Sequence, residues 1–161
     1  MQITIHLDEK SKRPTAKLQW FKNCHAMIDT GALFPVWTAP NFQLLALGAK
    51  LHEKNVPFSG FGGLTKGDLY KVDFKLGELI YKDMPIVVKK MENLNCHMIL
   101  SATMFEKMIY TIDTINHFFS IDTCDNQPIR HLDITKNSKQ ISVCLAGIYA
   151  SIEEYEKSAN T

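Results

Sequence analysis

Asp29 follows the apolar run 26–28 and is followed by Thr30, Gly31 and Ala32. The run suits a buried strand, and glycine suits the sharp turn that ends it. A carboxyl group at the end of a buried strand costs free energy unless it has partners or a chemical task. The Thr30 hydroxyl and a Gly31 N–H facing the carboxylate could be such partners. An acid held in this way can exchange protons, although the same tripeptide also forms ordinary turns.

A second unusual stretch, 56–65, holds Gly60, Gly62 and Gly63 around Phe61. Three glycines in four positions cannot stiffen a strand, but they allow a hairpin tip whose backbone lies against a ligand. A plain glycine turn between two surface strands is the alternative. A phosphate-binding loop fits less well, because no convincing helix follows.

Four widely spaced cysteines, with no C-x-x-C pair, give no sign of a metal site. They are Cys24, Cys96, Cys124 and Cys144, and we expect free, buried thiols in a reducing compartment. Cys24 and Cys96 are each followed by a histidine. Neighbours on a strand point to opposite faces, so neither pair could jointly bind a metal. A zinc site or a cysteine nucleophile assembled from distant segments stays open as an alternative.

Composition places the chain among globular proteins with a real core. It has 161 residues, 45% hydrophobic and 22% charged, with a net charge of +1. That balance gives no electrostatic reason to expect nucleic acid or a membrane surface as a partner. No apolar run approaches the roughly 18 residues that span a bilayer, and the N-terminus does not resemble a signal peptide. We therefore expect a cytoplasmic protein.

Alternating patterns and turn residues predict an all-β, barrel-like domain with one or two short helices. One helix is expected at 42–47, with Thr38 as its N-cap and Gly48 at its end, and a second at 103–108. The strands are expected at 2–7, 15–21, 24–28, 69–76, 79–81, 84–88, 110–113 and 117–121.

The stretch 26–32 resembles the active-site turn of aspartic proteases, and the length of the chain points to the retropepsin-like (retroviral-type) branch. Residues 60–63 are similar to the tip of the flap that closes over the peptide in that family. Ile99 and Leu100 match the apolar pair that packs behind the catalytic turn, with Ser101 where glycine is usual. The resemblance implies a retropepsin-like barrel whose active site forms at a homodimer interface.

The chain departs from the viral pattern in two places. Ser101 has less backbone freedom than the glycine it replaces. Leu33 and Ala102 stand where viral enzymes often pair an acid with an arginine, so no orphan charge remains. The absence of this pair favours a cellular or bacterial relative over a viral enzyme.

The resemblance extends over residues 1–122. Residues 123–161 are expected to form a C-terminal extension of unassigned role, with a strand at 140–145 and a helical end at 152–157.

The resemblance implies that Asp29, Thr30 and Gly31 are catalytic, without any cofactor or metal. The chemistry needs two carboxylates around one water, yet Asp-Thr-Gly occurs once in this chain. Asp113-Thr114 and Asp122-Thr123 lack the glycine. The second acid is therefore expected from Asp29 of a second copy, with Thr30 tying the two turns together.

The substrate-binding residues implied by the resemblance are Ala32, Ile99, Leu100 and the glycine-rich segment 60–63. Ala32 lacks the hydroxyl that pepsins often carry there, so the acid pair is expected to work at a higher pH. The expected activity is that of an aspartic endopeptidase acting on a peptide or protein. A dimeric module that binds peptides without cutting them is the main alternative, and a non-catalytic structural β domain is a third.

Overall fold

A computed structural model of the chain describes residues 1–20, 22–60, 63–91 and 94–132. Within these ranges the chain is mostly β-sheet, with one α-helix, α1 (Asn41–Ala46), and one 3-10 helix, η1 (Ala102–Phe105). This confirms the all-β class with short helices, which is consistent with a retropepsin-like fold. No described helix has the length and apolar character needed to cross a membrane.

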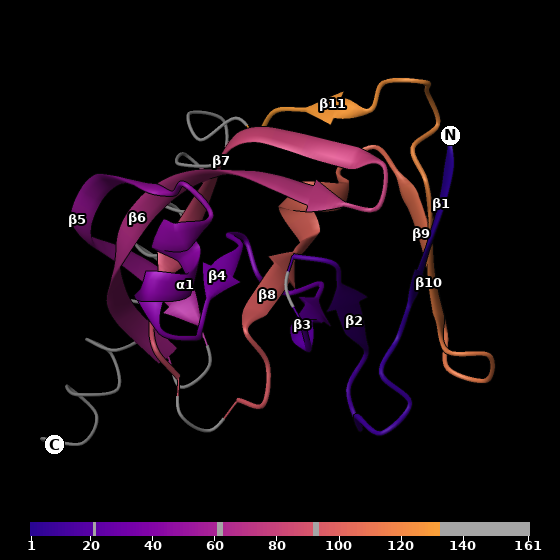
Figure 1. Cartoon of the computed structure of the whole chain (residues 1–161), viewed down its shortest axis with the longest axis horizontal. Helices are drawn as coiled ribbons and strands as arrows, with labels where there is room; N and C mark the ends of the chain where they lie inside the picture. Colours follow the sequence, from indigo (N-terminus) through magenta and orange to yellow (C-terminus); the bar gives the residue numbers. More distant parts are fainter. Residues whose placement is uncertain (21, 61–62, 92–93, 133–161) are drawn as a thin grey trace, which may run out of the picture.

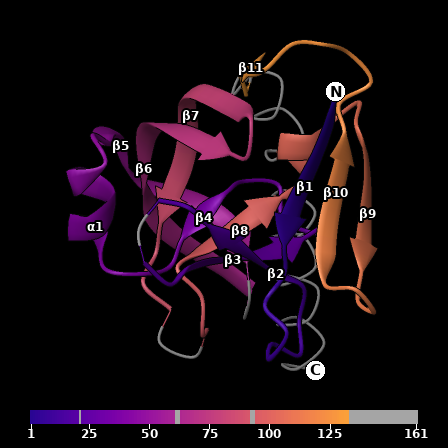
Figure 2. The same ribbon diagram turned by 45° about the vertical axis from the view of Figure 1, so that its right-hand side comes forward.

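The described strands form two sheets (Figure 1). The smaller sheet has the order β1-β10-β9, and the larger has the order β2-β3-β8-β4-β7-β6-β5, with β11 beside β7. Figure 1 and Figure 2 both place the smaller sheet at one end of the molecule, and α1 with the β5–β6 hairpin at the other. The strands are β1 (Gln2–His6), β2 (Thr15–Leu18), β3 (Cys24–Asp29), β4 (Val36–Trp37), β5 (Lys50–Gly60), β6 (Gly63–Leu76), β7 (Leu79–Val88), β8 (Met98–Ser101), β9 (Ile109–Asp113), β10 (Phe118–Asp122) and β11 (Ile129–Arg130).

Two hydrophobic clusters lie on either side of the central strands β3 and β8. Side chains alternate between faces along a strand, so neighbouring residues enter different clusters. Ile28 and Leu100 belong to the larger cluster, whereas Met27 and Ile99 belong to the smaller one. The end of β3, where Asp29 lies, is thus supported from both faces.

β7 is one continuous strand where the sequence predicted two, at 79–81 and 84–88. Asp83 lies where the predicted gap between the two strands would fall. It has a left-handed φ of 51°, and its main-chain N–H donates to Asp73 Oδ1 at 2.8 Å. The register of β6 against β7 shifts between Val72 and Phe74. A β-bulge opposite this point keeps the strand paired where a turn was expected.

Helix α1 lies where the sequence predicted it, and Gly48 follows it with a φ of 91°. The prediction of Thr38 as its N-cap is wrong, because the capping residue is Pro40 and no side chain caps the helix. The Thr38 hydroxyl instead donates to the Cys96 carbonyl at 2.9 Å. It links the segment before α1 to the segment before β8.

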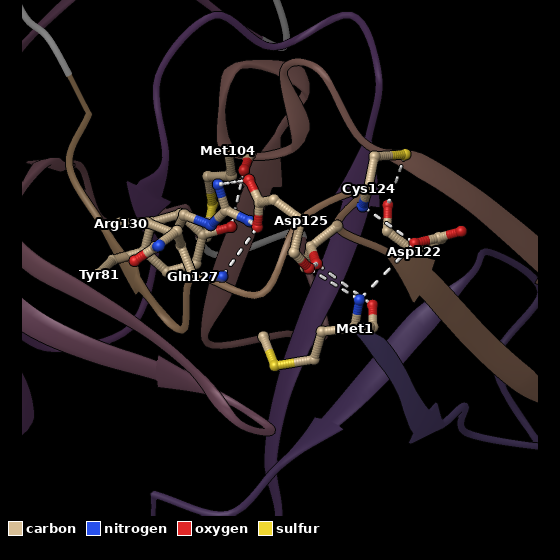
Figure 3. A network of polar contacts seen from close by, with 9 residues as sticks. Met1, Tyr81, Met104, Asp122, Cys124, Asp125, Gln127 and Arg130 are labelled. Atoms are coloured by element: carbon tan, nitrogen blue, oxygen red, sulfur yellow. Dashed lines mark hydrogen bonds and ion pairs between the residues drawn. The ribbon is translucent and has the colours of Figure 1, made fainter.

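The chain after β10 is held against the N-terminus and β7 (Figure 3). The buried Thr123 donates its N–H to the Met1 carbonyl at 3.0 Å, and the Met1 ammonium donates to the Asp125 carbonyl at 2.8 Å. Arg130 donates two hydrogen bonds to the Asp125 carboxylate, at 3.0 and 2.6 Å. β11 pairs in parallel with β7, so residues 123–130 are fastened onto the domain. The strand and helix expected at 140–145 and 152–157 lie outside the described residues.

Candidate active site

Asp29 is the last residue of β3 and lies beside Ser101 of β8 in a parallel pairing. Met27 and Ile28, which precede it, are buried, and Thr30 and Gly31, which follow it, are exposed. Asp29 itself is half-buried, at the boundary between the core and the surface. An acid in this position is fixed by the sheet and can still be reached from outside.

The turn after Asp29 closes onto its carboxylate. The Gly31 N–H donates to Asp29 Oδ1 at 2.9 Å, and the Ala32 N–H donates to the Asp29 carbonyl at 3.2 Å. A Cβ atom at residue 31 would lie 3.3 Å from Asp29 Oδ1, which is a tight contact. Glycine therefore allows the main chain to approach the carboxylate, as the sequence predicted.

A chain of hydroxyl groups supports this turn from β8. Ser101, which is fully buried, lies 2.7 Å from Thr103 through the two hydroxyl oxygens, and Thr103 Oγ1 donates to the Leu33 carbonyl at 2.7 Å. The Ala102 N–H also donates to the Ala32 carbonyl at 3.1 Å. The segment 101–103 thereby holds Ala32 and Leu33, which follow the Asp29 turn, in place.

The backbone conformation of Ser101 does not require the glycine that is usual at this position. Its φ of −92° and ψ of 157° are ordinary extended values that any residue adopts. No glycine is needed here, and the serine hydroxyl has a partner in Thr103. The sequence did not predict this contact, because it depends on how the chain turns after β8.

The glycine-rich stretch forms part of a long hairpin. β5 and β6 pair up to Gly60 opposite Gly63, while Phe61 and Gly62 lie outside the described residues. Gly67, which no sequence pattern singled out, allows β6 to approach β7. A Cβ there would lie 2.7 Å from a valine methyl of β7.

The expected substrate-contact residues fall into two groups. Ala32 is half-buried in the turn, whereas Ile99 and Leu100 are 3% and 0% exposed and belong to the core. Phe34 and Phe58 are also buried, in the same cluster as Ile99.

The cysteines and histidines form no metal site among the described residues. Cys24, Cys96 and Cys124 are free, but only Cys24 is buried, so the expectation of buried thiols holds for one of the three. Burial raises the pKa of the Cys24 thiol to about 12. Cys144 lies outside the described residues.

Strand pairing brings two distant histidines together, which the sequence did not predict. The main-chain N–H of His25 donates to the ring atom Nδ1 of His97 at 3.2 Å, and the main-chain N–H of His97 donates to the His25 carbonyl at 2.9 Å. His97 precedes β8 and is not on a strand, so the argument from opposite strand faces fails for Cys96 and His97. His25, Cys96 and His97 all line a cavity at this end of the strands.

Comparison with solved structures finds a likeness to a retropepsin-like aspartic protease from Rickettsia conorii. The likeness has a TM-score of 0.48 and 16% identity, and it covers 76% of this chain and 90% of the other. No family model matches the chain, and no curated protein matches it.

Proposed function

We propose that this chain is a retropepsin-like aspartic endopeptidase whose active site is completed by a second copy of the chain. The observation that carries the proposal is the Asp29 turn. Its carboxylate stands at the end of a central strand, accepts a hydrogen bond from the Gly31 N–H and borders an exposed surface. The turn is fixed from behind by β8, so the carboxylate is positioned before any substrate arrives.

The other two Asp-Thr pairs support a partner copy as the source of the second acid. The Asp113 carboxylate accepts hydrogen bonds from the main chain and side chain of Asn116, which lower the pKa of Asp113. The Asp122 carboxylate accepts the Cys124 N–H at 2.9 Å. Each is engaged in its own turn, and neither replaces the missing partner of Asp29.

In the proposed dimer, two Asp29 carboxylates share one proton and hold one water between them. The ionised carboxylate takes a proton from the water, whose oxygen bonds to the scissile carbonyl carbon. The protonated carboxyl gives its proton to the carbonyl oxygen. The resulting diol then collapses: the C–N bond breaks, one carboxyl group of the pair gives its proton to the leaving nitrogen, and the other carboxylate takes a proton from a diol hydroxyl, which restores the singly protonated pair. Ala32 and the β5–β6 hairpin are proposed to contact the peptide.

A cleavage assay on a mixed peptide library tests the activity directly. Asp29→Asn keeps the size of the side chain but removes the group that activates water, so turnover should fall to background. Asp83→Asn is the matched control, because Asp83 is 72% exposed and its left-handed φ of 51° suits asparagine. Loss of turnover in both variants, or in neither, would refute the role of Asp29. Peptide binding without turnover in the wild type would favour the non-cleaving module.

Dilution and mixing test the shared site. Below the dimer dissociation constant, the rate should fall with about the square of protein concentration. After subunit exchange with a ninefold excess of Asp29→Asn, only about a tenth of the wild-type subunits should be paired with each other, and activity should fall to match. A rate proportional to total enzyme at concentrations where sedimentation shows monomer would contradict the dimeric site.

A further inference from the structure

The strand β9 forms an open edge of the smaller sheet. Among the described residues it pairs with β10 alone, and Figure 2 shows it as the outermost strand of the three. In an antiparallel pair, every second residue points its N–H and C=O away from the partner strand. The outer side of β9 therefore carries main-chain donors and acceptors that another strand can use.

The core face of the smaller sheet is less well covered at β9 than at β10. Phe119 and Ile121 of β10 are both 0% exposed. Their partners on β9, Ile112 and Tyr110, pack against the same cluster but are only half-buried. On the opposite face of β9, Ile109 is 64% exposed. A further strand beside β9, with apolar side chains on the core face, would complete the cover of the two half-buried side chains.

The sequence supplies a matching strand after the last described residue. Residues 140–145 read Gln-Ile-Ser-Val-Cys-Leu, so apolar and polar side chains alternate over the segment. In a strand, Ile141, Val143 and Leu145 share one face, and Ser142 and Cys144 share the other. This segment, for which the sequence predicts a strand, lies outside the described residues. Its pattern is the one that the open side of β9 requires, apolar toward the core and polar toward the solvent.

The chain between Leu132 and this segment is long enough to reach β9. β11, which ends two residues before Leu132, pairs with β7, and the Tyr81 hydroxyl of β7 donates to the Met104 carbonyl at 2.6 Å. From Met104 to Ile109, the start of β9, the chain covers at most about 17 Å. The eight residue steps from Leu132 to Gln140 can span about 26 Å. β11 and the start of β9 lie at the same end of the molecule (Figure 2), so the segment would enter beside Ile109.

We propose that residues 140–145 of this chain add to the outer edge of β9 as a fourth strand of the smaller sheet. Because the segment enters beside the first residue of β9, it runs parallel to that strand. Its three apolar side chains cover the half-buried side chains of β9, and Ser142 and Cys144 face the solvent. The edge is then occupied by the chain's own C-terminal segment and not by a second copy. Pairing here does not depend on whether Asp29 cleaves peptides.

Disulfide formation tests the placement, because it needs two Cα atoms within about 7 Å of each other. The reporter is Thr111→Cys, at an exposed position of β9, in the full chain oxidised with glutathione. Its partner is either the natural Cys144 or, in a chain with Cys144→Ser, Ser142→Cys, because entry at the start of β9 places one of these two residues beside Thr111. Cys124→Ser removes the exposed natural thiol from every variant. In one of the two reporters we expect most of the protein to form an intramolecular disulfide.

Thr4→Cys is the matched control for the reporter on β9. Thr4, Ser120 and Thr111 form one row across the smaller sheet, and Thr4 is exposed like Thr111 but lies two strands farther from the proposed position. Neighbouring strands are about 4.8 Å apart, so a cysteine beside Thr111 would lie about 14 Å from Thr4. The control should therefore form less than about a tenth as much intramolecular disulfide.

A pair of substitutions tests which face of the segment meets the core. Val143→Asp places a charge on the core face, whereas Ser142→Asp places the same charge on the solvent face. In hydrogen exchange on the full chain, Val143→Asp should speed the exchange of the outward-pointing β9 amides about tenfold or more, and Ser142→Asp should change it less than about twofold. The β10 amides, which lie between β1 and β9, are the internal reference and should not change.

Three results would overturn the proposal. The first is no intramolecular disulfide in either reporter, or an equal yield in the Thr4→Cys control. The second is a disulfide between two chains, seen as a dimer on a non-reducing gel, which would assign the edge to a second copy. The third is an equal effect of Val143→Asp and Ser142→Asp on the β9 amides. None of these measurements uses peptide cleavage, so the role of Asp29 is judged separately by the library assay.

Discussion

Thr103→Val tests whether the hydroxyl chain behind the Asp29 turn stabilises the fold. Thr103 has one hydroxyl proton and gives it to the Leu33 carbonyl at 2.7 Å. The short contact with Ser101, also 2.7 Å, must therefore use the Ser101 proton. The direction of the chain is fixed: Ser101 donates to Thr103, which donates to Leu33. Valine has the shape of threonine without the hydroxyl, so the substitution breaks both bonds with little change in volume.

The burial of Ser101 sets the magnitude. Ser101 is 0% exposed, so water cannot replace the lost acceptor. An unsatisfied buried polar group costs about 1–3 kcal/mol, and we expect Thr103→Val to lower the free energy of unfolding by about 2 kcal/mol. Ser101→Ala should cost about 1 kcal/mol, because Thr103 keeps its bond to Leu33. In the double variant no orphaned serine remains, so its loss should fall short of the sum by about 1 kcal/mol.

Urea unfolding at a fixed protein concentration measures all four members of this cycle, with tryptophan fluorescence and circular dichroism as probes. The concentration must be held constant, because a dimer would be stabilised by mass action. Thr111→Val is the matched control, since Thr111 is exposed on β9. A loss below about 0.5 kcal/mol in Thr103→Val, or additivity within about 0.3 kcal/mol, would refute the directed chain.

Three further substitutions give separable outcomes. Gly31→Ala places a methyl group 3.3 Å from Asp29 Oδ1, so peptide cleavage should slow about tenfold while the urea midpoint changes little. Gly67→Ala places a methyl group 2.7 Å from a side chain and 2.8 Å from a main-chain oxygen of β7, so thermal unfolding should show a loss of about 2 kcal/mol. The Gln127 N–H and then Arg130 lower the pKa of Asp125, so this carboxylate adds stability above its ordinary pKa and loses it as pH falls through the lowered value. Arg130→Gln should therefore reduce the difference in urea midpoint between about pH 6 and pH 3, and an unchanged difference would contradict the ion pair's role.

The sequence predicted the features that depend on contacts between near neighbours. The turn at Asp29 needs a glycine two residues later, whose N–H reaches the carboxylate at 2.9 Å. Helix α1 ends before Gly48, which adopts the φ of 91° that glycine allows. Short-range preferences decide such features, so a single sequence contains them.

The sequence failed where a distant segment competed for a polar group. Thr38 has the right type and position for an N-cap, but the Cys96 carbonyl, 58 residues away, takes its hydroxyl. The sequence predicted two strands, at 79–81 and 84–88, yet Asp73 on the neighbouring strand accepts the Asp83 N–H and β7 is continuous. In both cases the partner can be named only once the strand order is known.

The histidines show why polar features at the two ends of β3 differ in how well they could be predicted. The acid turn is contained in three consecutive residues, and its local geometry follows from them. The cavity instead depends on the parallel pairing of β3 with β8, which places His25 beside His97 across 72 positions of sequence. Each histidine alone is an unremarkable neighbour of a cysteine. Their joint position exists because the two strands that support Asp29 at one end also bring these two segments together at the other.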